Sequence, residues 1–189
     1  REGKRLLGVI SQETHRMGQL IDDLLAFSRL GRAAILSSPI DMTALAQTAF
    51  DALAALHPHR NFELQVQALP PAFGDPPMVR VVLDNLLSNA IKFSAGRDPA
   101  VITIGSCQQD GRTVFYVKDN GAGFDVRYAN KLFAVFQRLH AATEFAGNGV
   151  GLALVKRIVD RHGGRVWAEA QVDQGATFYF TLPNEGAQS

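Results

Sequence analysis

Helix and strand patterns follow one another along this 189-residue sequence without the regular alternation that a parallel sheet requires. Because 47% of the residues are hydrophobic, the chain can bury a substantial core. Strand patterns cover residues 62–66, 101–104, 113–117, 166–168 and 178–180, and helical patterns cover residues 41–56, 75–93 and 150–162. This order predicts an α+β fold in which helices cover one face of a sheet.

The first 30 residues repeat apolar side chains at heptad spacing and contain no proline. Apart from Glu13, two heptad positions are apolar, and they hold Leu6, Leu20 and Phe27 and then Ile10, Met17 and Leu24. A lone helix cannot bury such a stripe, so we expect it to pack in a helical bundle or a dimer. The alternative is a helix that lies on its own domain. Gly31 and residues 37–39 interrupt the pattern and predict a short linker.

The charge balance and the cysteine count exclude several classes of protein. With 19 Lys and Arg against 18 Asp and Glu, the net charge of +1 gives no electrostatic reason to expect nucleic acid or an anionic membrane as the main partner. The single cysteine, Cys107, excludes an internal disulfide framework and a multi-cysteine zinc site. No apolar run approaches the ~20 residues that a membrane-spanning helix needs. We therefore expect a cytoplasmic fragment that makes no membrane contact.

The predicted helix at residues 75–93 carries two asparagines, Asn85 and Asn89, on one face beside its apolar positions. An amide oxygen can ligate Mg²⁺, while the amide nitrogen donates to a phosphate or to water. Lys92 places a cation on the neighbouring surface. The alternative is a pair of amides that only satisfy backbone groups near the core.

Two glycine-rich motifs follow this helix in the sequence. Asp119 comes directly after a strand pattern and precedes Gly121 and Gly123, so a carboxylate that can accept from an exocyclic amine stands beside backbone that a flat ring can approach. Residues 147–152, with glycine at every second position, open a helix whose first amides suit a polyphosphate. A dinucleotide fingerprint is excluded because no strand leads into this second motif.

Taken in order, these motifs resemble those of the sensor histidine kinases, which belong to the ATPases that share the Bergerat nucleotide-binding fold. The matching segments are residues 85–94, 119–124, 133–138, 147–154 and 175–183, and residues 17–32 are similar to the second dimerisation helix of phytochrome-like and multi-sensor members. The resemblance implies a two-layer α/β sandwich, with a mixed sheet and helices on one face, preceded by a long dimerisation helix. The implied domains are residues 1–32, a dimerisation and phosphotransfer hairpin whose first helix is missing, and residues 33–189, the ATP-binding catalytic domain.

The resemblance also implies a site for ATP and Mg²⁺. Asn89 would ligate the Mg²⁺ that bridges the phosphates, and Asn85 and Lys92 would line the phosphate and ribose side as the other catalytic residues. Asp119 would bind the adenine amino group, with help from Thr177. Phosphoryl transfer at such a site relies on positioning and on charge neutralisation.

Further nucleotide contacts are implied by the same resemblance. Phe93 would pack near the adenine. Residues 125–147 would form a lid over the nucleotide, anchored by Phe133 and Phe136, from which Arg138 reaches the phosphates. The remaining implied contacts are Gly121, Gly123 and Phe124 in the first glycine motif and Gly147, Gly149, Val150, Gly151 and Leu152 in the second.

The implied activity is that of a two-component protein-histidine kinase. The γ-phosphoryl group of ATP would pass to a histidine on a dimerisation helix of the same protein, which is expected to be a homodimer, and then to the receiver domain of a response regulator. His15 does not fit the motif of the phosphoacceptor histidine, because no acidic residue follows it and it lies in the segment assigned to the second dimerisation helix. The alternatives are an ATPase or protein-serine kinase of the same fold, and a dimerising module that binds no nucleotide.

Overall fold

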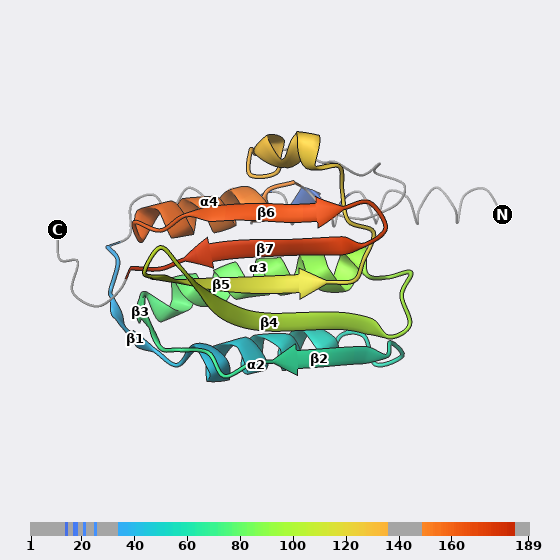
Figure 1. Ribbon diagram of the computed structural model, residues 1–189, viewed down its shortest axis with the longest axis horizontal. Helices are drawn as coiled ribbons and strands as arrows, with labels where there is room; N and C mark the ends of the chain where they lie inside the picture. Colours follow the sequence, from blue (N-terminus) through green and yellow to red (C-terminus); the bar gives the residue numbers. More distant parts are fainter. Residues whose placement is uncertain are drawn as a thin grey trace.

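The computed structural model describes residues 34–135 and 149–183, together with Thr14, Met17, Gly18, Ile21 and Leu25. Its elements, in chain order, are β1 (Ser38–Ile40), α2 (Met42–Ala54), β2 (Phe62–Val66), β3 (Ala72–Gly74), α3 (Pro76–Phe93), β4 (Ala100–Gln109), β5 (Arg112–Asp119), the 3₁₀ helix η1 (Val126–Lys131), α4 (Gly151–Arg161), β6 (Val166–Gln171) and β7 (Gly175–Thr181). Figure 1 shows these elements along the chain. Every helix and strand predicted within this part of the chain is present.

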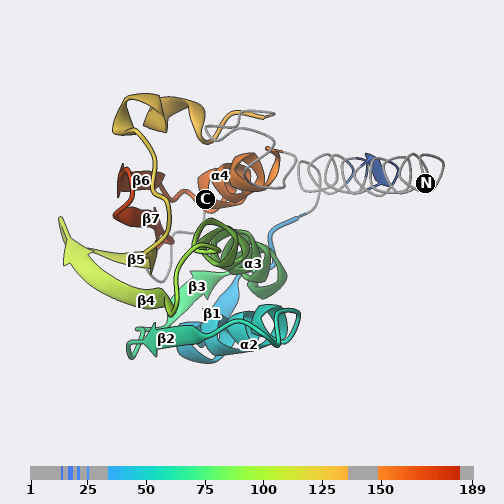
Figure 2. The same cartoon turned by 90° about the vertical axis from the view of Figure 1, so that its right-hand side faces the viewer.

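Five strands form one mixed sheet in the order β2-β4-β5-β7-β6. The β2–β4 pair is parallel and the other pairs are antiparallel. Helices α2, α3 and α4 lie together on one side of this sheet (Figure 2). The predicted α+β fold, a two-layer sandwich with helices on one face, is therefore confirmed.

A second, two-stranded sheet was not predicted. β1 pairs antiparallel with β3, so that Ser38 lies opposite Gly74 and Ile40 lies opposite Ala72. Residues 37–39 were predicted as a linker, and neither segment shows a strand pattern, because each is three residues long and is flanked or interrupted by proline. Strands this short show no readable alternation, and their pairing is fixed by the elements on either side.

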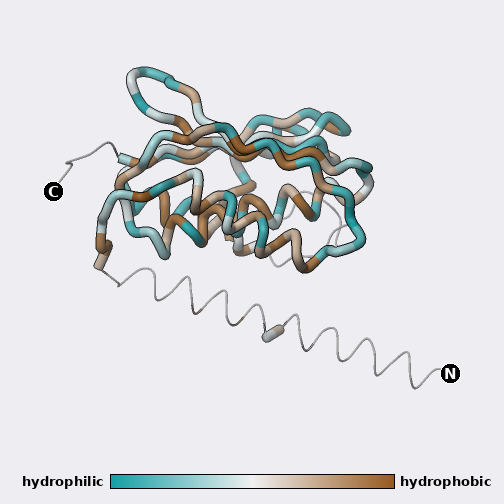
Figure 3. The backbone as a smooth tube through the Cα atoms, turned by 90° about the horizontal axis from the view of Figure 1, so that it is seen from below, coloured by the Kyte–Doolittle hydropathy of each residue, from teal (hydrophilic) through white to brown (hydrophobic). Residues whose placement is uncertain are grey.

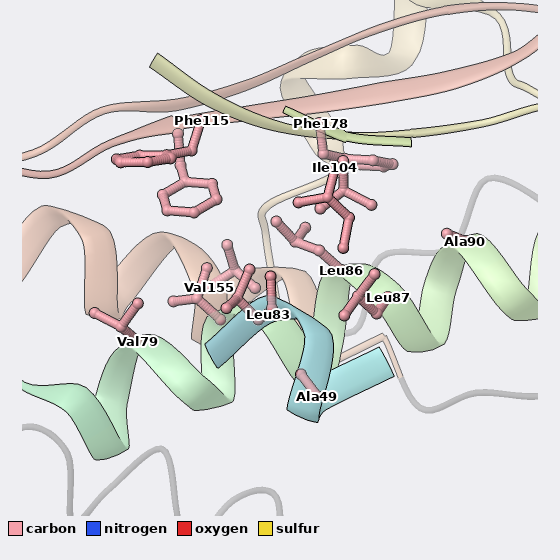
Figure 4. Close-up of a cluster of buried hydrophobic side chains, with 14 of the residues drawn as sticks. Ala49, Val79, Leu83, Leu86, Leu87, Ala90, Ile104, Phe115, Val155 and Phe178 are labelled. Atoms are coloured by element: carbon pink, nitrogen blue, oxygen red, sulfur yellow. The ribbon is translucent and has the colours of Figure 1, made fainter. Parts of the chain in front are cut away.

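The hydrophobic core fills the space between the sheet and the helices. Apolar residues occur along both the sheet and the helices (Figure 3), and the buried ones form a single cluster. In the close-up, Leu83 and Leu86 of α3 and Val155 of α4 lie below Phe115 and Phe178 of the sheet (Figure 4). All five residues are at most 4% exposed. Helix α3 is thus the central element of the helical layer.

The beginning of α3 is fixed by a buried hydrogen-bonding cluster around Asp75. The Asp75 carboxylate accepts from the backbone N–H of Met78 and from that of Leu36, each at 3.1 Å. The backbone N–H of Asp75 donates to Nε2 of His162 at 3.0 Å, and Nδ1 of His162 lies 2.8 Å from the carbonyl oxygen of Ile158. His162 is therefore neutral, with its proton on Nδ1. The cluster joins α3, the end of α4 and the segment before β1.

Only a small part of the predicted N-terminal helix lies within the described residues. Thr14, Met17, Gly18, Ile21 and Leu25 are helical, and Met17, Ile21 and Leu25 are 61%, 55% and 47% exposed. The rest of the heptad pattern lies outside the described residues. Among the described residues, no helix combines the length and apolar character needed to cross a membrane.

The two helix caps Asp75 and Asp41 offer a matched test of this arrangement. Asp41 accepts from the backbone N–H of Ala44 at 3.0 Å but is exposed, whereas Asp75 is buried. We expect Asp75→Ala to lower the free energy of unfolding by about 3 kcal/mol, because it leaves buried N–H donors unsatisfied, and Asp41→Ala to lower it by about 1 kcal/mol. Urea denaturation measures both, and equal losses would contradict the structural role given to Asp75.

Candidate nucleotide-binding site

The predicted asparagine pair lies on α3, at the edge of its buried face. Leu86, Leu87 and Ala90 are buried beneath the sheet, whereas Asn85 and Asn89 are partly exposed. Nδ2 of Asn85 donates to the carbonyl oxygen of Val81 at 2.8 Å. Its Oδ1 faces Gly151, where an added Cβ would overlap it. The helix with the two amides therefore packs directly against the beginning of α4, which carries the second glycine motif.

The first glycine motif lies against the other end of α3. The backbone N–H of Ala122 donates to the carbonyl oxygen of Phe93 at 3.0 Å. A Cβ added at Gly121 would lie 2.5 Å from the same oxygen, so only glycine permits this approach. The loop after β5 and the C-terminal turn of α3 are thus in contact, as the predicted site requires.

Asp119 is held at the end of β5 by its own loop. Its side chain accepts from the backbone N–H of Gly121 at 2.8 Å and also from that of Ala176. Only 3% of Asp119 is exposed, and this burial raises the pKa of its carboxyl from 3.8 to about 6, while the two N–H donors act in the opposite direction. At neutral pH the group is a desolvated carboxylate, which can accept a hydrogen bond from an amino group on a bound ring.

The N-terminus of α4 has the features of an anion site. Gly149 has a φ of +71°, Val150 is buried, and no side chain caps the helix. The amides of the first helical turn have no partner within the helix, and the positive end of the helix dipole lies there. Because Gly151 also faces Asn85, this terminus adjoins the first of the two asparagines of α3.

Lys92 and Phe93 occupy the last turn of α3. Nζ of Lys92 lies 4.2 Å from the centre of the Phe93 ring. Both residues are partly exposed, next to the loop that carries Asp119. The structure thus places Gly151 against Asn85 and Gly121 against Phe93, while Asn89 and Lys92 lie between these two contacts along α3.

The prediction that Thr177 assists Asp119 is wrong for its side chain. Residues alternate between the two faces along β7, so that Ala176 and Phe178 are buried toward the helices. Thr177 instead shares the outer face with Tyr179, and their hydroxyl groups form a hydrogen bond. Asp119 is on the buried face, hydrogen-bonded to the backbone of Ala176. The sequence motif placed Thr177 at the right position along the strand but on the wrong face.

Three other predicted contacts have packing roles. Phe124 is 7% exposed and its ring centre lies 6.2 Å from that of Phe178, so it anchors the loop in the core. Val150 is 1% exposed, and Leu152 packs against the core while partly exposed. Phe124 and Val150 therefore anchor the two glycine motifs in the core, whereas part of Leu152 stays exposed.

The predicted lid is described only at its beginning. Asp125 caps η1 and forms an ion pair with Arg127, and Phe133 packs partly buried against the core. A hollow of about 530 Å³ lies between residues 133–135 and α4, and among the described residues none of the predicted nucleotide contacts lines it. Phe136, Arg138 and Gly147 lie outside the described residues.

Sequence reasoning missed two residues that shape this region. His162 gave no sequence signal beyond its place before two glycines, yet it is buried and tied to the cap of α3. Arg97 lies in a turn and donates to carbonyl oxygens of the loop that follows Asp119. Both act through partners that are distant in the sequence, which local patterns do not reveal.

Comparison with known proteins agrees with this geometry. Residues 74–186, more than half of the chain, match the family described as histidine kinase-, DNA gyrase B-, and HSP90-like ATPase. Cyanobacterial phytochrome A from Nostoc sp. is 36% identical over 172 residues, which are 91% of this chain and 22% of that protein. The chain therefore spans about a fifth of the length of this relative.

Two solved structures also have a fold similar to that of this chain. A crystal structure of full-length ShkA in complex with AMPPNP is 26% identical, with a TM-score of 0.74 over 97% of this chain and 39% of that one. The mycobacterial sensor histidine kinase MprB is 25% identical, with a TM-score of 0.66 over 78% of this chain and 97% of that one.

The described fold is that of an ATP-binding domain with the Bergerat fold. The chain belongs to the family of histidine kinase-, DNA gyrase B- and HSP90-like ATPases, and within it the domain is of the histidine-kinase catalytic type.

The raised pKa of Asp119 predicts how stability depends on pH. The contribution of Asp119 to stability is fully present below about pH 3.8 and is lost as the pH rises through about 6, because the folded protein must then hold a buried charge. Relative to Asp119→Asn, we expect the free energy of unfolding of the wild type to fall by about 2 kcal/mol between about pH 4 and pH 7. Urea denaturation across this range measures the difference, and a constant difference would contradict the burial of an ionised group.

Proposed function

We propose that this chain is the ATP-binding catalytic part of a two-component sensor histidine kinase. It would transfer the γ-phosphoryl group of ATP to a histidine on a dimerisation helix, for relay to the receiver domain of a response regulator. One observation supports the proposal: the glycine-rich start of α4 lies against Asn85 of α3, and the loop that holds the Asp119 carboxylate lies against Phe93 at the end of the same helix. These are the donors and acceptors that an adenine nucleotide needs.

Each group has a role that follows from its chemistry. The Asp119 carboxylate would accept from the adenine amino group, and the glycine backbone at Gly121 and Gly123 leaves room for the ring. The first amides of α4 would hold the phosphates, together with Lys92 and Asn85. Positioning and neutralisation of charge then account for the chemical step, with no covalent role for the protein.

The side chains present fit a magnesium ion held mainly by the nucleotide. Among the described residues no three His, Cys, Asp or Glu side chains gather at one point. Mg²⁺ bound with ATP commonly keeps several waters and takes one or two oxygen ligands from the protein, so the amide oxygen of Asn89 is a suitable donor. When bound, the ion would neutralise charge on the phosphates.

Two alternatives are less well supported. An ATPase of this fold needs a carboxylate to activate water one helical turn before Asn89, and that position is Asn85. The adjacent Asp84 pairs with Arg80 at 2.7 Å on the surface of α3, which engages it away from the amide pair. A nucleotide-inert module has no use for a buried carboxylate such as Asp119, which lowers stability at neutral pH.

Dimerisation is part of the proposal. Residues 17–32 resemble the second dimerisation helix of phytochrome-like kinases, and Met17, Ile21 and Leu25 are exposed apolar side chains on a helix. A partner helix, in the same or another subunit, would cover them. The complete protein would then be a homodimer, and this domain would be cytoplasmic.

The activity is tested by mixing the chain with a separate helical hairpin that carries the histidine acceptor of a phytochrome-type kinase. With Mg²⁺ and labelled ATP we expect acid-labile, alkali-stable phosphate on the hairpin, and no transfer when its histidine is replaced. A folded sample that binds ATP but transfers no phosphate would count against the kinase. Rapid release of inorganic phosphate without transfer would favour an ATPase.

Replacing the amide of Asn89 tests the metal role. We expect Asn89→Ala to weaken binding of Mg²⁺–ATP at least tenfold while the far-ultraviolet circular dichroism stays native-like, because a loss of about 1.4 kcal/mol or more follows from removing a metal ligand. Calorimetry with a non-hydrolysable ATP analogue measures this. Asn61→Ala is the matched control, since Asn61 is an exposed amide that bonds Asp98 at 3.1 Å. Equal effects in the two variants would remove Asn89 from the site.

A further inference from the structure

Arg97 joins two loops beside the proposed adenine pocket. It lies in the turn between α3 and β4, and its guanidinium group donates to carbonyl oxygens of two loops. Nε donates to Asn120 O at 2.8 Å, and Nη2 donates to Gly121 O at 3.3 Å and to Asp173 O at 2.6 Å. Asn120 and Gly121 directly follow Asp119, and Asp173 lies in the turn between β6 and β7.

The two loops are already in close contact. The backbone N–H of Asp173 donates to the carbonyl oxygen of Ala122 at 2.7 Å. A Cβ added at Gly123 would overlap the carbonyl oxygen of Gln171, and one added at Gly175 would overlap that of Asp119. Several backbone carbonyl oxygens therefore lie close together where these two loops meet, and their partial negative charges favour a hydrogen-bond donor. Arg97 supplies a cation with the planar, forked geometry that several carbonyls can share.

One peptide group connects Arg97 to Asp119. The carbonyl oxygen of Asn120 accepts from Arg97, and the N–H of the same peptide unit, that of Gly121, donates to Oδ1 of Asp119 at 2.8 Å. The peptide is planar, so fixing its oxygen also fixes the direction of its N–H. A cation at the oxygen further polarises the N–H and strengthens its bond to the carboxylate.

We propose that Arg97 is a positioning residue for adenine recognition, which aims the Asp119 carboxylate by clamping the peptide between Asn120 and Gly121. Arg97 does not touch the nucleotide in this arrangement. Without it, the peptide can rotate, because glycine on one side imposes little restraint. The carboxylate then loses the Gly121 N–H, one of the two backbone donors that orient it, and keeps only that of Ala176. The inference rests on the proposed function, in which Asp119 reads the adenine amino group.

The test compares ATP with inosine triphosphate, which has the same ribose and triphosphate but carries a carbonyl oxygen in place of the adenine amino group and a proton on N1. We expect Arg97→Gln to raise the dissociation constant for a non-hydrolysable ATP analogue about tenfold and that for the inosine analogue by less than about threefold. The preference for adenine therefore falls, whereas general damage to the pocket would weaken both ligands alike. Arg97→Lys keeps the charge without the fork, and we expect it to restore part of the preference.

Arg60 provides the matched control. It is also an arginine that clamps backbone carbonyls, those of Ile91 and Ser94 at 2.5 Å and 2.9 Å, but it does not contact the loop after Asp119. We expect Arg60→Gln to lower the melting temperature of the full 189-residue chain and to leave the preference for adenine unchanged.

The possible results separate the two levels of inference. If Arg97→Gln folds and its adenine preference is unchanged, the role of Arg97 is overturned but the proposed adenine site is not. If Arg97→Gln does not fold, an unchanged adenine preference in Arg97→Lys overturns the role of Arg97 in the same way. A preference that falls as much in Arg60→Gln also overturns it. A wild-type chain that binds neither nucleotide, or binds both equally, instead contradicts the proposed adenine site itself.

Discussion

The packing of α3 against the sheet is the constraint on which both the core and the site depend. An α-helix has 3.6 residues per turn, so a helix that buries Leu83, Leu86 and Leu87 carries Asn85 and Asn89 together at the edge of its buried face. The core therefore fixes the rotation of α3 about its axis. Rotating α3 to turn Asn85 away from α4 would expose buried leucines to water. Hydrophobic burial therefore fixes the position of the polar side chains on α3.

The buried carboxylate of Asp119 lowers the stability of the folded protein at neutral pH. Burial disfavours its charged form, and the N–H groups of Gly121 and Ala176 offset only part of that cost, as the raised pKa indicates. Groups that are unfavourable for folding but suited to a ligand are typical of functional sites. The surrounding backbone is correspondingly well fixed, by Phe93 on one side and by Arg97 on the other.

The same cluster of contacts links the site to the segment that precedes the domain. Asp75 caps α3, accepts from Leu36 and is held by His162 at the end of α4. A change in the path of the chain before β1 would therefore act on the two helices that carry the proposed phosphate contacts. The hydrogen bonds of Asp75 thus connect the segment entering the domain with the beginning of α3 and the end of α4.

Much of the fold and of the site could be predicted from local sequence. The period of the apolar residues identified α3 and α4, Asp41 and Asp75 are caps of an expected kind, and Gly121 and Gly151 stand where only a hydrogen leaves room for Phe93 and Asn85. The short strands β1 and β3 were not predicted, because three residues are too few to show an alternating pattern. Thr177 was placed wrongly because a motif gives a position along a strand but not the face that the sheet buries.

By itself, the sequence determined which elements form and which polar residues accompany them, because periodicity, caps and turn glycines act over a few neighbouring residues. Tertiary structure alone decided which face Thr177 occupies, that His162 is buried and neutral, and that Arg97 clamps a peptide beside Asp119. Their partners lie far away in the chain, 87 residues for His162 and Asp75 and 76 for Arg97 and Asp173. Such partners meet only when the sheet and helices pack, since burial of the core brings them together.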